Sequence, residues 1–154
     1  MPPYIREAEL TYRRRKTPDV VGEPAFTTVR SSADVAPVAR ALIGTRVTES
    51  FIVLALSCRH KVIGFHEVAR GSVSACPVVL GDVFRYPLIA GAAAIIVAHN
   101  HPSGDVTPSA EDVVITQRIV DASALLGLQV LVHLIVSDER HYSFLDAGQL
   151  GPRS

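Results

Sequence analysis

The sequence predicts an α/β domain in which a mixed central sheet is flanked by helices. Short apolar runs without polar alternation, at residues 49–57 and 92–98, are typical of buried strands. The clearest helical segment, residues 109–126, begins after a capping Ser109 and stops at Gly127. The chain has 154 residues, of which 48% are apolar, so it is long enough for one domain with a sizeable core.

The other elements follow from local signals. A first helix is expected to start at a cap provided by Ser31, Ser32 or Asp34 and to stop at Gly44. A polar link at residues 58–60 joins two strands into a hairpin. The predicted elements are helices at 32–43, 82–90 and 109–126 and strands at 49–57, 61–68, 72–79, 92–98, 129–136 and 141–145, with a polar loop at 99–108.

The first 28 residues differ from the rest. They are rich in proline and poor in apolar periodicity, so we expect an extended or partly disordered basic arm at residues 1–28 and the folded domain at residues 29–154. The arm is expected to be mainly a solvated tail, with DNA or an acidic partner as the alternative contact of its basic run. That run is Arg13, Arg14, Arg15 and Lys16.

Composition limits the function classes. The chain has 15 basic and 15 acidic residues, which excludes a polyanion binder that relies on bulk positive charge. Cys58 and Cys76 form neither a disulfide framework nor a metal-binding CxxC pair. The longest apolar run, residues 88–98, is much shorter than the roughly 20 residues of a membrane helix. We therefore expect a reduced, cytoplasmic protein with no membrane partner and no targeting segment.

A polar loop after the buried strand concentrates the chemistry-bearing residues. His99 and His101 are two residues apart at a strand end, so both side chains point to the same side. Asp112 lies at the start of the next helix and can fold back toward them. Two imidazoles and one carboxylate would leave one position open on a tetrahedral zinc ion, which is the pattern of a catalytic site. A water in that position has a pKa of about 7 and still needs a general base.

Each of these residues also has a purely structural explanation. The histidines could be ordinary polar residues at a strand end. Ser109 is a natural helix N-cap, and Asp112 at the third helical position is favoured by the helix dipole. Only the combination is difficult to explain without a metal ion.

That combination, H-x-H-x7-S-x2-D, resembles the JAMM (MPN+) metalloprotease motif, and the segment from His99 to Asp105 resembles its RadC branch. The resemblance covers about residues 32–148. It implies the JAB/MPN fold of the cytidine deaminase-like architecture and a short form without the helix-hairpin-helix region of longer members. It further implies that Ser109 supports the oxyanion and that the zinc ligands are His99, His101 and Asp112.

The resemblance also implies a glutamate base on an earlier strand. Glu67 matches the expected position and is our candidate; Glu49 is the alternative. A salt bridge between Glu67 and Arg70 is the structural explanation that competes with catalysis. The sequence departs from the family at positions that are not motif ligands, so these departures concern the groove or the surroundings of the metal. They are Leu80, Gly81 and Val132.

We therefore expect a zinc-dependent metallopeptidase or isopeptidase whose substrate is a peptide or protein, including a ubiquitin-like conjugate. The alternative is a RadC-like DNA-repair or recombination accessory protein that binds DNA or acts as a nuclease. A non-catalytic MPN scaffold is less consistent with the sequence, because such scaffolds usually lose metal ligands and this chain keeps them. HNH nucleases and zinc nucleobase deaminases are excluded by the spacing of their motifs.

Overall fold

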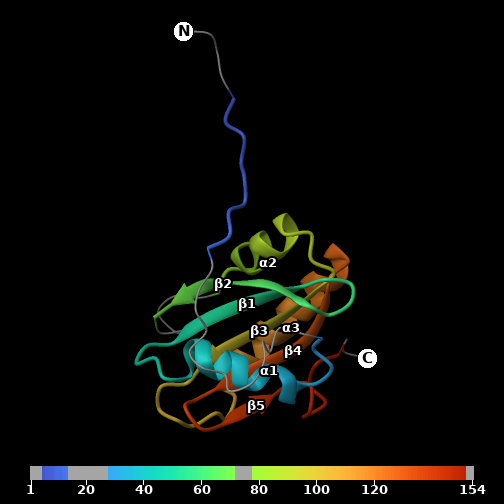
Figure 1. Cartoon of the computed structure of the whole chain (residues 1–154). Helices are drawn as coiled ribbons and strands as arrows, with labels where there is room; N and C mark the ends of the chain where they lie inside the picture. Colours follow the sequence, from blue (N-terminus) through green and yellow to red (C-terminus); the bar gives the residue numbers. More distant parts are fainter. Residues whose placement is uncertain (1–4, 14–27, 72–77, 152–154) are drawn as a thin grey trace.

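A five-stranded mixed sheet forms the centre of the computed structural model, which describes residues 5–13, 28–71 and 78–151 (Figure 1). The strand order is β2-β1-β3-β4-β5. Strands β3 and β4 are parallel, and the other neighbouring pairs are antiparallel. The strands are β1 Ser50–Leu56, β2 Val62–Arg70, β3 Ala94–Asn100, β4 Gln129–Val136 and β5 His141–Ser143. The predicted α/β class with a mixed sheet is confirmed.

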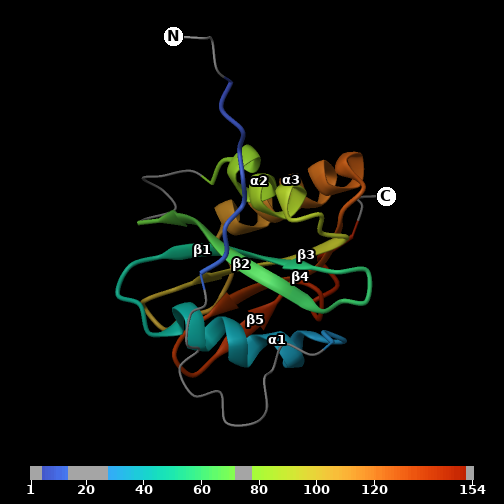
Figure 2. The same ribbon diagram turned by 45° about the horizontal axis from the view of Figure 1, so that its top comes forward.

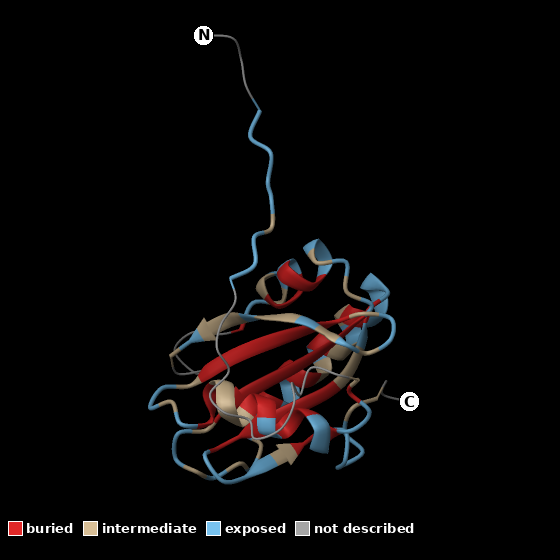
Figure 3. Cartoon of the chain, in the orientation of Figure 1, coloured by how far each residue is buried: buried red, intermediate tan, exposed pale blue. Residues whose placement is uncertain are grey.

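Helices cover both faces of this sheet (Figure 2). Helix α1 (Ser32–Ala39), continued by the π-helical turn η1 (Arg40–Gly44), packs on one face, while α2 (Leu80–Ile89) and α3 (Ala110–Leu126) lie on the other. Alternate residues of β1 belong to the two cores: Ile52 faces α1, whereas Phe51 faces α2 and α3. Strands β1 and β3 are buried throughout, and their residues are apolar except Ser50, His99 and Asn100 (Figure 3).

The first helix begins where Ser31 places it, and the alternative start at Asp34 is wrong. Asp34 occupies the third helical position, where its carboxylate accepts hydrogen bonds from the backbone N–H groups of Arg30 and Ser31. The helix then continues through Gly44 rather than stopping before it. A Cβ at Gly44 would lie 2.8 Å from the carbonyl oxygen of Ser137, so the close approach of η1 to the end of β4 requires glycine.

The hairpin of β1 and β2 is confirmed, but several strand limits differ from the prediction. Strand β2 extends to Arg70 rather than residue 68, and β5 ends at Ser143 rather than residue 145. The strand predicted at residues 72–79 falls mostly outside the described residues, and its described part, Val78 and Val79, is not in a strand; Val79 precedes α2 as its cap. Strand β3 continues through His99 and Asn100, which we had assigned to the following loop. Pairing with both β1 and β4 accounts for this extension.

The clearest predicted helix has the expected ends. Ser109 caps α3, and Gly127 follows it in the left-handed conformation with a φ of 69°. Of the predicted arm, residues 5–13 contain no helix or strand. Leu10 packs against the core beside α2, and Tyr12 contacts Tyr86 with ring centroids 6.3 Å apart, while the residues before them extend away from the sheet (Figure 1). The residues Arg14, Arg15 and Lys16 lie outside the described part, so a contact of the arm with DNA stays a prediction. Among the described residues, no helix is long and apolar enough to cross a membrane.

Candidate metal centre

The end of β3 and the beginning of α3 bring His99, His101 and Asp112 together. The Nε2 atom of His99 lies 3.0 Å from Asp112 Oδ1, and the Nε2 atom of His101 lies 3.3 Å from Asp112 Oδ2. The two Nε2 atoms are 3.2 Å apart. His99 and Asp112 are buried, whereas His101 is partly exposed. The three side chains therefore converge on one point that is closed on the core side and open toward solvent.

This geometry suits a metal ion. Each residue offers one ligand atom, and these atoms lie within 4.8 Å of one another. Ligands about 2.0–2.1 Å from a tetrahedral zinc ion lie roughly 3.3 Å apart, close to the distances observed here. Imidazole nitrogens and carboxylate oxygens also accept hydrogen bonds, so their convergence needs a positive charge among them, either a proton or a metal ion. The residues fit zinc in number, chemistry and spacing.

The pKa values of Asp112 and His101 also indicate that a positive charge is favoured within the cluster. Burial raises the pKa of Asp112, but hydrogen bonds from His101 and His99 outweigh it and hold that pKa well below its ordinary value. The hydrogen bond with Asp112 raises the pKa of His101, and the charge of Glu49 adds to this effect. A cation at the centre is thus favoured by the surrounding charges.

The N-terminus of α3 fixes the orientation of Asp112. The backbone N–H of Ser109 donates to Asp112 Oδ2 at 2.8 Å, and the backbone N–H of Asp112 donates to Ser109 Oγ at 3.1 Å. This reciprocal capping box explains both residues structurally and also aims the Asp112 carboxylate at the histidines. Because Ser109 Oγ acts as an acceptor here, its own hydroxyl proton is available to another partner.

Two buried side chains, His133 and Phe51, contact the His99 ring away from its Nε2 atom. His99 Nδ1 lies 3.1 Å from Nε2 of His133, which is in the middle of β4. His133 Nδ1 in turn lies 2.6 Å from Thr116 Oγ1 on α3. Phe51 stacks on the His99 ring with a centroid distance of 5.7 Å, and burial lowers the pKa of His133 well below its ordinary value. His99 is therefore held by His133 at Nδ1 and by Phe51 through ring stacking, while Nε2 faces Asp112.

Glu67 is not part of this cluster. Arg46 Nη1 lies 2.6 Å from Glu67 Oε1, and Arg70 donates to both carboxylate oxygens at 2.8 and 2.9 Å. The hydrogen bond from Arg70, with the charge of Arg46, lowers the pKa of Glu67 to about 2 despite partial burial. Glu67 pairs with Ile52, which faces α1, so its side chain lies on the sheet face opposite Phe51 and His99. Glu67 therefore forms the salt bridge with Arg70 that was the structural alternative to a catalytic role.

Glu49 lies closer to the histidines. It directly precedes β1 and is partly buried. Phe51 pairs with His99, and continuing this antiparallel register by two residues brings Glu49 opposite His101. Asn100 holds the segment in place: its Oδ1 accepts from Ser50 N at 2.7 Å, and its Nδ2 donates to the carbonyl oxygen of Thr48 at 3.1 Å. The alternation of β1 gives Glu49 the same face as Phe51 and His99.

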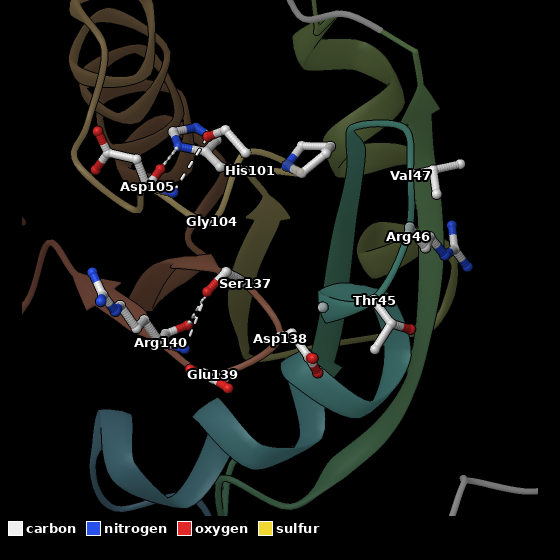
Figure 4. Close-up of a pocket in the computed structure, with 13 residues that line it drawn as sticks. Thr45, Arg46, Val47, His101, Gly104, Asp105, Ser137, Asp138, Glu139 and Arg140 are labelled. Carbon is white, nitrogen blue, oxygen red and sulfur yellow. Dashed lines mark hydrogen bonds between the residues drawn. The ribbon is translucent and has the colours of Figure 1, made fainter.

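An open cavity of about 660 Å³ borders the cluster at His101 (Figure 4). Its walls come from the segment after η1, the loop after β3 and the turn between β4 and β5. The lining is largely polar, and both arginine and acidic side chains contribute to it. The labelled residues include Arg46, Asp105, Asp138, Glu139 and Arg140 (Figure 4). A cavity of this size can hold several atoms of an extended chain beside the cluster.

A family model for the RadC-like JAB domain matches residues 29–149. The chain belongs to this family. It is 40% identical over 124 residues to a UPF0758 protein of Moorella thermoacetica, covering 80% of this chain and 54% of that protein. It is 44% identical over 109 residues to one of Burkholderia thailandensis (71% and 42% covered), and 36% identical over 126 residues to one of Staphylococcus haemolyticus (82% and 55%). The chain thus spans about half the length of the curated relatives it matches.

In this RadC-like JAB domain, the predicted ligands and Ser109 lie together at one end of α3, and Glu67 lies apart from them. Three further residues contribute to the site and were not predicted from the sequence: Asn100, Thr116 and His133. A single polar residue inside the apolar run 129–136 was the available signal for His133, because a buried imidazole needs hydrogen-bond partners. Thr116 was signalled only by its position one helical turn after Asp112.

Proposed function

We propose that this RadC-like JAB domain is a zinc-dependent hydrolase that cleaves a peptide or isopeptide bond. The observation that carries the proposal is the convergence of three ligand atoms, from His99, His101 and Asp112, at the border of an open cavity. Two imidazoles and one carboxylate are a ligand set suited to zinc. When bound, the zinc ion supplies a Lewis acid for the substrate carbonyl and lowers the pKa of water to about 7.

Glu49, rather than Glu67, is proposed as the general base. A base must be able to hold a proton, and the two arginines that keep the pKa of Glu67 at about 2 oppose this. The register of β1 brings Glu49 opposite His101, which supports a position beside the cluster. Its carboxylate would take the proton of the attacking water and then deliver it to the leaving amine.

Ser109 is proposed to stabilise the oxyanion. Its Oγ accepts the backbone hydrogen bond of Asp112, so the hydroxyl proton can be donated to developing negative charge on the substrate oxygen. The backbone N–H of Ser109 is already engaged by Asp112, so only the side chain is available for this role. The same residue therefore caps the helix and donates to the substrate.

The substrate is proposed to be an extended peptide or the tail of a protein, including a ubiquitin-like conjugate. An open, polar cavity of about 660 Å³ beside His101 is compatible with a chain whose backbone amides need hydrogen-bond partners. An isopeptide bond has the same carbonyl and amide groups, so the proposed residues would act on it in the same way.

Matched glutamate variants test this function. Zinc-loaded wild-type protein, Glu49→Gln and Glu67→Gln are incubated with a peptide library and with a dimer of a ubiquitin-like protein joined through lysine, and mass spectrometry counts new termini. Loss of the general base is expected to reduce the rate by roughly 10²- to 10⁴-fold in Glu49→Gln, with zinc content unchanged. Glu67→Gln should stay near the wild-type rate. Cleavage by none of the proteins, or equal cleavage by wild type and Glu49→Gln, would refute the proposal.

A further inference from the structure

A buried polar chain runs behind the candidate metal ligands, away from the cavity. It consists of His99, His133 and Thr116, all buried in the core between the sheet and α3. Phe144 stacks on His133 with ring centroids 4.7 Å apart, and Phe51 packs edge-on against it at 5.8 Å. An imidazole enclosed by aromatic rings is costly unless its two nitrogens are hydrogen-bonded, and both are bonded here.

The direction of each hydrogen bond in this chain follows from Thr116. Its Oγ1 lies 2.6 Å from the main-chain oxygen of Asp112, and a carbonyl oxygen can only accept, so the hydroxyl proton points there. Oγ1 must then accept in its 2.6 Å contact with His133 Nδ1. His133 therefore carries its proton on Nδ1.

The Nε2 atom of His133 determines which nitrogen of His99 carries a proton. An imidazole ring that carries its proton on Nδ1 presents a lone pair on Nε2. That lone pair accepts from His99 Nδ1 across 3.1 Å. His99 thereby donates from Nδ1, which turns its Nε2 atom toward Asp112 and His101, where a metal ion would be bound.

We propose that His133 and Thr116 are positioning residues that fix the tautomer and ring orientation of His99 for metal binding. This inference rests on the proposed metal centre. Metal-bound histidines usually donate their other N–H to a carboxylate, carbonyl or water. In this chain the Nε2 atom of a second histidine is the acceptor, and a threonine hydrogen-bonded to the main chain of Asp112 orients that histidine. The ligand pair His99 and Asp112 is thus linked through the core as well as through the metal.

Two substitutions remove the links separately. His133→Phe keeps an aromatic ring among Phe51 and Phe144 but removes the acceptor for His99, so zinc affinity should fall by roughly 10- to 100-fold, as for other residues of this kind. Thr116→Val keeps the shape of the side chain but leaves His133 free to protonate on Nε2, so affinity should fall in the same direction by less. Thr116→Ser retains the hydroxyl and should restore affinity close to the wild-type value.

The control is Ile119→Val, a buried substitution on the same helix that contacts the core around α2 and α3. It should lower the melting temperature without changing zinc affinity, which separates loss of stability from loss of positioning. Zinc affinity is measured by competition with a chromophoric chelator. Nitrogen-15 NMR of the imidazoles in the metal-free proteins reports which nitrogen of His99 carries the proton.

The expected result is a His99 protonated on Nδ1 in the wild type and a mixture of tautomers in His133→Phe and Thr116→Val, with the corresponding losses of affinity. Wild-type affinity in both variants, or a His99 that lacks a proton on Nδ1 in the metal-free wild type, would overturn the inference. If His133→Phe does not fold, the comparison of Thr116→Val with Thr116→Ser still tests the inference. If the wild type binds no zinc, the proposed function fails, while the tautomer of His99 still tests the positioning role.

Discussion

Asp112 and Glu67 are carboxylates at the same end of the sheet, one on each face, and their surroundings differ in one respect. Glu67 has a side chain that is 24% exposed and is paired with two arginines. The Asp112 side chain is 3% exposed and faces two imidazoles, whose positive charge depends on a bound proton. Two arginines of the chain neutralise the charge of Glu67. Asp112 and the two histidines instead need a proton or a metal ion from the solvent. A buried carboxylate without a permanently charged partner is thus the better sign of a metal site.

The largest expected effect separates these two carboxylates. Asp112→Asn removes the only anionic ligand, yet its amide oxygen can still accept from Ser109 N, so the helix start should survive. Stoichiometric zinc in the wild type is expected to fall to a background level in Asp112→Asn and to remain in Glu67→Gln. Elemental analysis of the purified proteins, with circular dichroism as the folding control, measures this. Equal zinc in both variants would contradict the distinction.

Metal removal should affect stability through the same centre. A ligand that binds only the folded state at 1,000 times its Kd adds about 4 kcal/mol to the free energy of unfolding. Zinc should therefore raise the Tm of the wild type and of Glu67→Gln by similar amounts, and chelation should reverse this. Thermal unfolding of Asp112→Asn should be insensitive to both. A zinc-dependent Tm in that variant would place the metal elsewhere.

Ser109 allows capping to be separated from metal binding. Ser109→Ala removes the side-chain acceptor for Asp112 N, which should cost about 1 kcal/mol of stability. The backbone N–H at position 109 still orients the Asp112 carboxylate, so zinc affinity should change little. Chemical denaturation and zinc titration of the same sample check both expectations. A large loss of zinc affinity would show that the hydroxyl, not the backbone, positions Asp112.

The smallest expected effect is the pH dependence of the stability that the ion pairs of Glu67 contribute. Its pKa is about 2 in the folded protein against an ordinary 4.5, so the unfolded state binds more protons between these values. The ion pairs therefore stabilise the fold above about pH 4.5, and their contribution is lost as the pH falls toward 2. Solvent screening limits it to about 0.2–1 kcal/mol. Urea denaturation should show that difference between wild type and Glu67→Gln at neutral pH and a smaller one near pH 3. A constant difference would argue against the ion pairs.

The sequence predicted the parts of the molecule that depend on local patterns. The buried strand before His99, the cap at Ser109 and the stop at Gly127 are properties of neighbouring residues, and all three are found in the structure. Glu67 shows the limit of this reasoning. Strand alternation places Glu67 on the same face as Phe65, but the register shift between Phe51 and Ile52 and the choice of that face depend on pairing with β1. Contacts such as His99 with His133 join residues 34 positions apart, so local patterns could not reveal them.

A crystal structure with X-ray data collected on both sides of the zinc absorption edge tests the central claim most directly. The account predicts an anomalous peak within bonding distance of His99 Nε2, His101 Nε2 and one oxygen of Asp112, with Glu67 still paired to Arg46 and Arg70. Zinc-grown crystals with no peak at these three residues, or with the peak at Glu67, would contradict it.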